Sequence, residues 1–290
     1  MAVAPEKVLH QVFFPTSFTE LFTAWGRFPD AVPYAGGSEL IRCQERRVPV
    51  LPRNIISLNK LGELHHMSRT ERYLEIGAMV TLNAIIRLGK IVPEILTLCL
   101  EGIGGPQIRN TATIGGNLCS SRRLLDAPAA MIALDAHYEL KTASQTRWIS
   151  AARFSSLPDP PSIAPQELLT RIRIPLEQWN FSFYRKFNTR GKNEAGGAAV
   201  FILNAQKNIL RDIRIVFAGD MIIREKNAET LLAGKSLPLD KRDVGVFMEH
   251  WKTYLSGIGD TSTGGEGPAA GMIKAQILNF IEASILGFAE

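Results

Sequence analysis

Two glycine-rich segments carry the residue types best suited to hold a phosphate-bearing ligand. The first segment consists of Ala35, Gly36, Gly37, Ser38, Glu39 and Leu40. Paired glycines let several backbone N–H groups point into one concavity, and a missing Cβ lets a phosphate approach the backbone closely. The Ser38 hydroxyl adds a further donor. A tight turn between a strand and a helix has the same composition, so this segment alone leaves both interpretations open.

The second segment adds an amide and several hydroxyls to its glycines. Its members are Thr113, Gly115, Gly116, Asn117 and Ser120, and Asp126 follows nine residues after Asn117. This mixture of donors and acceptors suits a polyhydroxyl chain, although a loop that satisfies its own backbone has a similar composition. Neither segment matches G-x-G-x-x-G or G-x-x-x-x-G-K-[ST], which argues against a Rossmann dinucleotide site and a Walker loop.

The histidines and cysteines indicate neither hydrolysis nor metal binding. No two of His10, His65, His66, His137 and His250 have the i,i+4 spacing of a metal-binding helix. The neighbours His65 and His66 are expected on opposite sides of a strand. Three widely spaced cysteines predict no disulfide framework, and Cys99 is expected to be a small buried hydrophobe. The sequence therefore predicts no catalytic side chain and no metal ligand.

The elements around the two glycine segments alternate between helices and strands. Ser17 or Thr16, with Glu20 three residues after Ser17, predicts the start of an amphipathic helix. The hydrophobic pattern predicts helices at 17–28, 81–91 and 91–103, and strands at 31–34, 54–61 and the start of 73–82. Residues 127–142 predict a helix or buried run that leads into a strand.

The second half of the chain has a different pattern. A proline-rich loop at 158–165 precedes a predicted strand at 168–175. Three more strands, at 181–190, 196–205 and 213–219, predict an antiparallel sheet, and helices are expected at 225–234 and from 268 onward. The chain is thus expected to divide near residues 176–180.

Composition limits the classes of function. With 290 residues, 46% of them apolar and 21% charged, the chain is long enough for about two domains with buried cores. The net charge of +5 is mild, and the densest basic cluster, Arg42, Arg46, Arg47 and Arg53, has no interleaved aromatics. This argues against nucleic-acid binding and favours a basic pocket for an anionic cofactor or partner subunit. Without a signal-peptide pattern or an 18-residue apolar stretch, a cytoplasmic location is expected.

Read together and in order, four segments resemble one family. The segments are AGGSEL (35–40), NIISLNKLGEL (54–64), YLEIGAMVTLNAI (73–85) and GGPQIRNTATIGGNL (104–118). Their order and spacing resemble the FAD-binding subunit of molybdenum hydroxylases, which includes the xanthine dehydrogenase FAD subunit and the carbon monoxide dehydrogenase medium subunit. The resemblance runs from about residue 10 to residue 150 and continues more loosely through 183–191 and 214–237.

The resemblance implies an α+β fold. A two-part FAD-binding domain of the vanillyl-alcohol-oxidase (PCMH) type would occupy residues 1–60 and 61–178. A small antiparallel sheet with helices would then form a C-terminal flavoprotein domain over residues 179–290.

The resemblance also implies roles for individual residues. The first glycine segment, with Tyr34 leading in, would wrap the FAD pyrophosphate, and the second would hold FAD from the other side. Asp126 would contact the ribityl region and Lys186 would lie near the isoalloxazine. Ile103 takes a position near the flavin ring that is aromatic in some members. The chain departs from the family at Arg122-Arg123-Leu124-Leu125, where small residues are common.

The implied function is electron transfer through noncovalent FAD. Iron–sulfur and molybdopterin subunits would be separate partners, and NAD or another molecule would accept the electrons. Two alternatives stay open at this stage. One is a free-standing flavin oxidoreductase with its own substrate pocket. The other is an assembly subunit that has lost FAD, which the Arg122–Leu125 departure motivates.

Overall fold

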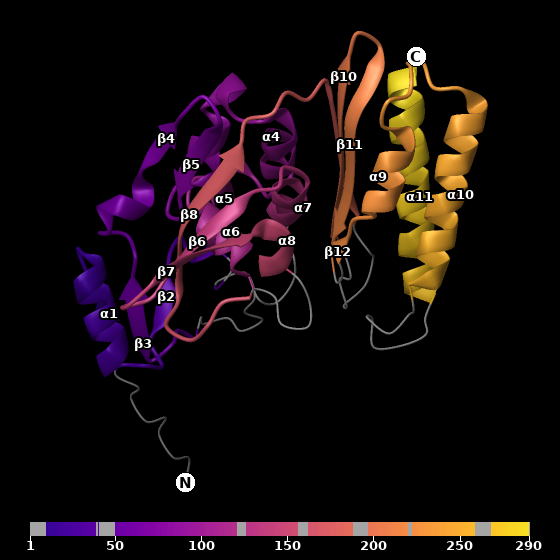
Figure 1. Ribbon diagram of the computed structural model, residues 1–290. Coiled ribbons are helices and arrows are strands. Elements are labelled where there is room, and N and C mark those ends of the chain that lie inside the picture. The colour runs from indigo at the N-terminus through magenta and orange to yellow at the C-terminus, as the bar shows by residue number, and fades with distance from the viewer. Residues whose placement is uncertain are drawn as a thin grey trace.

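The computed structural model describes residues 10–38, 40, 50–120, 126–155, 162–187, 197–219, 222–258 and 268–289. Helices and strands mix throughout, and the strands form three sheets. Figure 1 shows the four-stranded sheet between the helices α4 and α7 on one side and the C-terminal helices on the other. Among the described residues, no helix is both long enough and apolar enough to cross a membrane.

A three-stranded parallel sheet with one covering helix forms the N-terminal part. Its strands are β1 (Gln11–Phe13), β3 (Asn54–Ser57) and β2 (Val32–Tyr34), in that order. The helix α1 (Phe18–Arg27) begins as predicted, because the Ser17 side chain accepts from the Glu20 N–H at 3.2 Å. The Glu20 carboxylate in turn accepts from the Thr16 N–H at 2.8 Å. These reciprocal bonds satisfy N–H groups that a helix start otherwise leaves unpaired.

A five-stranded antiparallel sheet follows, covered on one face by short helices. Its strands, in spatial order, are β4 (Met67–Arg69), β5 (Tyr73–Gly77), β8 (Leu168–Pro175), β6 (His137–Lys141) and β7 (Thr146–Ser150). The helices are α3 (Leu82–Ile86), α4 (Glu94–Glu101), α5 (Pro106–Arg109), α6 (Ile114–Leu118), α7 (Asp126–Ala133) and α8 (Ala151–Phe154). A 3-10 turn, η1 (Gly62–His65), lies between β3 and β4, and a second, η2 (Gly89–Ile91), lies between α3 and α4.

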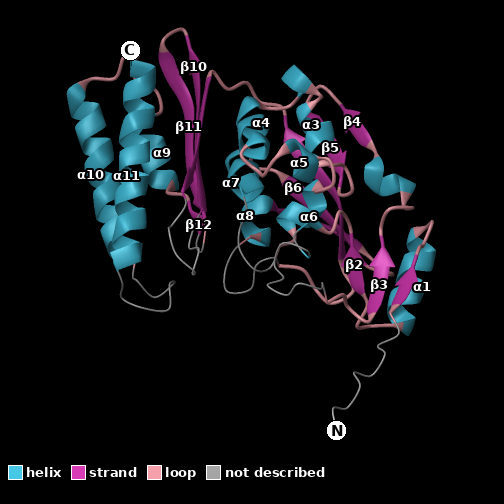
Figure 2. Ribbon diagram, turned by 180° about the vertical axis from the view of Figure 1, so that it is seen from behind, coloured by secondary structure: helices cyan, strands magenta, loops and turns pink. Residues whose placement is uncertain are grey.

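The C-terminal part is a four-stranded antiparallel sheet with three helices. The strand order is β12 (Ile222–Ile223), β11 (Ile209–Ala218), β10 (Gly197–Gln206) and β9 (Phe181–Phe187). Figure 2 shows α10 (Lys241–Gly257) and α11 (Pro268–Ala289) on the outer side of this sheet, together with α9 (Lys226–Leu232). Alternate residues serve two cores: Val200 packs with the core of the first half, and Phe201 packs with the C-terminal helices. Burial on both faces explains the nearly continuous apolar runs of β10 and β11.

Two expectations about local structure were wrong in detail. The helix expected at 91–103 begins only at Glu94, because Pro93 disfavours helical geometry in the residue before it. His65 ends the 3-10 turn η1 and does not lie on a strand. The predicted strand at 168–175 is confirmed as β8. The strands predicted at 181–190, 196–205 and 213–219 are confirmed within their described residues, and they pair antiparallel as expected.

Candidate functional site

The structure brings the two glycine segments together. Strand β2 leads directly into residues 35–38, which lie against the chain that enters α6. A Cβ on Gly36 would collide with the backbone carbonyl of Thr111. A Cβ on Gly116 would lie 3.9 Å from the Ala35 Cβ. Segments far apart in sequence thus form one surface.

Three of the four glycines in these segments are required by the fold itself. Gly37 has φ +68°, a left-handed conformation that glycine adopts at no steric cost, and a Cβ there would collide with the Tyr34 ring. Gly36 is held against the Thr111 backbone, and a Cβ on Gly115 would lie 2.7 Å from the Ala78 Cβ. Close packing of the protein explains these positions without any ligand.

Gly116 is different, because few atoms of the described residues lie in the space beside it. The residue is exposed. Among the described residues, a Cβ would meet within 4 Å only the Thr113 Oγ1, at 3.0 Å, and the Ala35 Cβ, at 3.9 Å. Its N–H donates to that same Thr113 hydroxyl at 3.1 Å, which caps the start of α6. An open glycine beside a second glycine segment is a surface that a ligand can approach at backbone distance.

Two buried polar atoms beside Gly116 have no hydrogen-bond partner within the described part of the chain. The Asn117 Oδ1 and the Ser120 Oγ find no hydrogen bond among the described residues, and Asn117 is only 6% exposed. An unsatisfied buried polar group costs about 1–3 kcal/mol, so such groups are usually paired by something. An amide oxygen and a hydroxyl together can accept from and donate to a polyhydroxyl chain. These residues therefore fit the ligand that their composition predicts.

Asp126, Lys186 and Ile103 form a second group, held by three elements. Asp126 is the first residue of α7 and is buried. The Lys186 Nζ, from β9, lies 2.7 Å from its Oδ2 and donates to the Gly102 carbonyl at 3.3 Å. Ile103, next to Gly102 beyond the end of α4, is half-buried against the core. The residues predicted separately are thus brought together, and the ion pair between two of them is new.

Sequence reasoning missed Tyr184, which shares a strand face with Lys186. Its hydroxyl is buried and has no hydrogen-bond partner among the described residues. Burial, and secondly the nearby Asp126 carboxylate, raise the pKa of Tyr184, so the phenol stays protonated. A Cβ on Gly102 would collide with this hydroxyl. The signal was available, because residues two apart on a strand point to one face.

Arg109, also missed, holds the loop that carries Ile103. One guanidinium nitrogen, Nη1, donates to the carbonyls of Glu101 at 3.0 Å and Ile103 at 3.2 Å, and to that of Gly104. These carbonyls at and beyond the end of α4 have few helical partners, so a cation compensates them well. No pattern in the sequence signals this contact, since it depends on the turn that Gly104 makes at φ +51°.

The remaining predicted residues are placed as follows. Ser38 and Leu40 are half-buried at the start of the segment after Gly37. Glu39, Arg42, Arg46, Arg47 and residues 122–125 lie outside the described residues. Cys99 is fully buried, as expected. Burial raises its pKa and raises the pKa of Cys119 to about 12, so neither thiol is a nucleophile at neutral pH. In the described part of the chain, no cluster of three potential metal ligands occurs.

The arrangement offers binding groups and one buried charge pair. Backbone N–H groups, an amide, hydroxyls, a carboxylate and an ammonium surround the two glycine segments and the start of α7. Its described residues include no activated thiol and no cluster of metal ligands. This is the chemistry of a site that positions a large polar cofactor and leaves the reaction to it.

A family model described as "FAD binding domain in molybdopterin dehydrogenase" matches residues 8–177. This range includes both glycine segments and Asp126, and it ends before Lys186.

Two curated proteins and one solved structure illustrate the similarity. The carbon monoxide dehydrogenase medium chain of Afipia carboxidovorans is 30% identical over 246 residues, which cover 83% of each chain. The glyceraldehyde dehydrogenase medium chain of Sulfolobus acidocaldarius is 28% identical over 209 residues, covering 71% of this chain and 74% of the relative. A crystal structure of Cu,Mo-CO dehydrogenase contains a chain that superposes with a TM-score of 0.76 at 25% identity, covering 96% of this chain and 98% of that one.

Proposed function

The chain belongs to the family of FAD-binding domains of molybdopterin dehydrogenases, and from this membership we propose that it is an electron-transfer subunit that holds one noncovalent FAD. In this role it receives electrons from iron–sulfur clusters on a neighbouring subunit and delivers them to NAD or another acceptor. Its class as an FAD-containing oxidoreductase subunit follows from the family. The acceptor, the partners and the individual contacts are the content of the proposal.

We propose that the two glycine segments bind the cofactor from opposite sides. Residues 35–40, with Tyr34 leading in, lie along the pyrophosphate. Thr113, Gly115, Gly116, Asn117 and Ser120 hold the opposite side. The observation that carries this assignment is the meeting of the two segments around Gly116, beside the unpartnered Asn117 and Ser120. Close backbone approach and unpaired polar atoms are what a phosphate-bearing, hydroxyl-rich cofactor needs.

The second group of residues orients the rest of the cofactor. FAD supplies the two-electron redox chemistry when it is bound. Asp126 accepts a hydrogen bond from a ribityl hydroxyl, and Ile103 presents an apolar surface beside the ring. Lys186 contributes a positive charge near the flavin while its ammonium remains paired with Asp126. No side chain of this chain acts as a general acid or base.

We further propose how the fold divides. Residues 1–60 and 61–178 form the two parts of a PCMH-type FAD-binding domain, and residues 179–290 form the C-terminal flavoprotein domain. The three sheets support this division, because each lies within one of the three ranges.

The partners follow from what the sequence lacks and from the names of its relatives. The three cysteines of the chain are far apart and do not form an iron–sulfur ligand pattern, so electrons must arrive from a neighbour. The carbon monoxide and glyceraldehyde dehydrogenase relatives are medium chains, a term that implies further subunits. We propose an iron–sulfur subunit and a molybdopterin subunit. Mixing the three purified subunits should give substrate-dependent flavin reduction; oxidation of a small organic substrate by the isolated chain at the same rate would contradict this.

Gly116→Val tests the binding site. A valine fills the open space beside Ala35, where the backbone of the proposed site meets the cofactor. We expect the variant to lose FAD while its circular dichroism and unfolding midpoint stay close to those of wild type. Gly62→Val is the matched control, because Gly62 is also exposed and has nothing within 4 Å of a Cβ. A wild-type flavin content in the Gly116→Val protein would contradict the proposed site. An equal loss of flavin in the Gly62→Val protein would also contradict it.

A further inference from the structure

Helix α7 packs against elements of both halves of the molecule, and its first residue is Asp126. All eight of its residues are buried. It lies between α4 and the strands β10 and β11, as both ribbon views show (Figures 1 and 2). The position of this helix therefore depends on the protein elements that pack against it.

Most side chains of α7 are small. After Asp126 the helix reads Ala-Pro-Ala-Ala-Met-Ile-Ala. Small side chains offer few knobs to interlock with neighbouring elements, so apolar packing alone distinguishes weakly between axial positions of the helix. Directional hydrogen bonds at the two helix ends add a constraint on this axial position.

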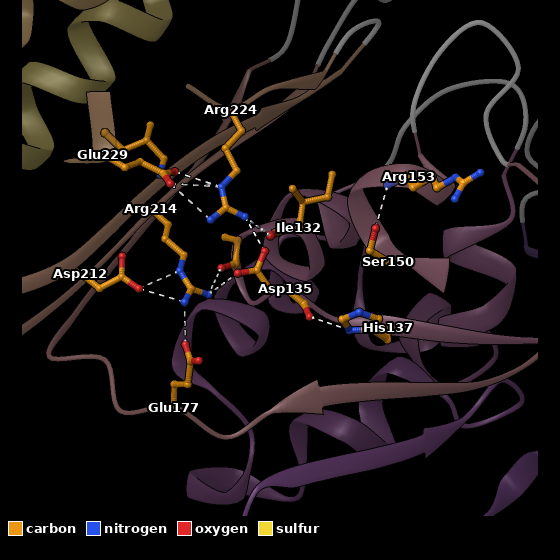
Figure 3. Close-up of polar contacts among 12 residues, drawn as sticks. Ile132, Asp135, His137, Ser150, Arg153, Glu177, Asp212, Arg214, Arg224 and Glu229 are labelled. Atoms are coloured by element: carbon orange, nitrogen blue, oxygen red, sulfur yellow. Dashed lines mark hydrogen bonds and ion pairs between the residues drawn. The ribbon is translucent and has the colours of Figure 1, made fainter. Parts of the chain in front are cut away.

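Two arginines of the C-terminal half bind the far end of α7 (Figure 3). The Arg224 Nη1 donates to the Ile132 carbonyl at 3.0 Å, and the Arg214 Nη1 donates to the Ala133 carbonyl at 2.9 Å. Both also pair with Asp135, just beyond the helix, at 2.6 Å and 3.0 Å. Cations are favoured at this end because the last carbonyls carry partial negative charge.

The arginines are themselves fixed by the C-terminal half and by the connecting segment. The side chain of Arg214 is 10% exposed and pairs with Asp212 at 2.9 Å and with Glu177 at 2.8 Å. Its guanidinium also lies over the Trp179 ring, 4.6 Å from the centroid. Arg224 pairs with Glu229 at 3.1 Å. Figure 3 shows Asp135 between the two guanidinium groups. The two arginine side chains are only 10% and 11% exposed, and a planar guanidinium with several partners defines geometry more sharply than a flexible ammonium does.

The helix is thus held at both ends by one half of the molecule. Lys186 of β9 binds Asp126 at the start of α7, and Arg214 of β11 binds the last carbonyl, about 10 Å further along the axis. A shift of α7 by a fraction of an ångström would move the Asp126 carboxylate by the same amount.

We infer that Arg214 and Arg224 are positioning residues for the cofactor: they set the axial position of α7 and thereby place Asp126 for FAD. The inference rests on the proposed function, since it assumes that Asp126 contacts FAD. It assigns to the C-terminal half a role in cofactor binding through residues that do not touch the cofactor.

The test measures the FAD affinity of the isolated chain by flavin fluorescence. The single variants are Arg214→Met, Arg224→Met and Asp126→Asn, and they are compared with wild type. Each arginine variant is also combined with Asp126→Asn. Methionine keeps the apolar stem of arginine and removes its donors. We expect each arginine variant to bind FAD more weakly by about 2- to 30-fold, the range for residues that act through an intervening element. In the Asp126→Asn background the arginine changes should have almost no further effect.

Arg147→Gln is the control for general loss of stability. Arg147 also binds a buried carboxylate, that of Glu167, through two hydrogen bonds of 2.6 Å and 2.7 Å, and its other partner is the Ser162 carbonyl, so these partners lie outside α7. This variant should unfold at a lower temperature and keep wild-type FAD affinity. Should the methionine variants fail to fold, Arg214→Lys and Arg224→Lys replace them. Lysine keeps the positive charge and lacks the planar guanidinium, and each lysine variant is again measured with and without Asp126→Asn.

The outcomes distinguish FAD binding by the chain from the positioning role of Arg214 and Arg224. Wild-type protein that binds no FAD contradicts the proposed function. Wild-type protein that binds FAD, with arginine variants of unchanged affinity, overturns the positioning role alone. An arginine effect of equal size with and without Asp126 also overturns it, because the arginines would then act by another route.

Discussion

The ion pair between Lys186 and Asp126 lies where the two halves of the chain meet, and Lys186→Met removes one of its partners. The Lys186 Nζ is 2.7 Å from an Asp126 carboxylate that is 6% exposed. Hydrogen bonds to charged groups contribute about 1.5–3 kcal/mol to stability. Because the Lys186 side chain is 41% exposed, water replaces part of this interaction. We expect the FAD-free protein to lose about 2 kcal/mol, which lowers the unfolding midpoint of a chain of this length by about 3 °C.

A double-mutant cycle isolates this interaction. Asp126→Asn alone removes the negative charge, and the double variant removes both partners, so Lys186→Met should cost little once Asp126 is neutral. Urea unfolding of the four FAD-free proteins should give a coupling energy of about 2 kcal/mol. Since the carboxylate is buried, raising the salt concentration should change this coupling little. A coupling energy below about 0.5 kcal/mol would refute the claim that the pair joins α7 to β9.

Two further perturbations separate packing from cofactor binding and test a buried carboxylate. Gly36→Ala forces a Cβ against the Thr111 carbonyl, so we expect it to lower stability by about 1–3 kcal/mol and to reduce FAD binding, as thermal unfolding and flavin content will report. Hydrogen bonds from Arg147 hold the pKa of Glu167 below its ordinary value of 4.5. A carboxyl whose pKa is lower in the folded state than in the unfolded state stabilises the protein at pH values above the unfolded pKa. This stabilisation is lost as the pH falls through the lower, folded-state pKa. Arg147→Gln should therefore cost about 1–3 kcal/mol at pH 7 and progressively less below about pH 4, measured by urea titration; a pH-independent difference would contradict the assignment.

Local signals in the sequence predicted the elements and the glycine segments well. Ser17 and Glu20 marked the start of α1 because capping depends on residues three apart. Runs rich in aromatic and β-branched residues identified β9, β10 and β11, and those of β10 and β11 are nearly continuous because both faces of that sheet are buried. The Gly37 conformation follows from the same kind of local rule, since a left-handed residue in a turn favours glycine.

What the sequence did not reveal depends on contacts between distant elements. Lys186 and Asp126 are 60 residues apart, and nothing in either segment indicates that β9 lies beside the start of α7. The hydrogen bonds from Arg109 to the carbonyls of the loop at 101–104 depend on the path of a turn, which only the tertiary structure determines. The burial of α7 on every side removed the amphipathic pattern that identifies a helix, which is why 127–142 read equally well as a helix or a buried run.

The most direct test of the account is the cofactor content of the purified chain. Precipitation with acid or heat should release FAD, and not FMN, into the supernatant at one equivalent per chain. Protein stripped of flavin should take up one equivalent of added FAD with quenching of its fluorescence, and Gly116→Val protein should not. A chain that is colourless as purified and fails to take up added FAD would contradict the central claim.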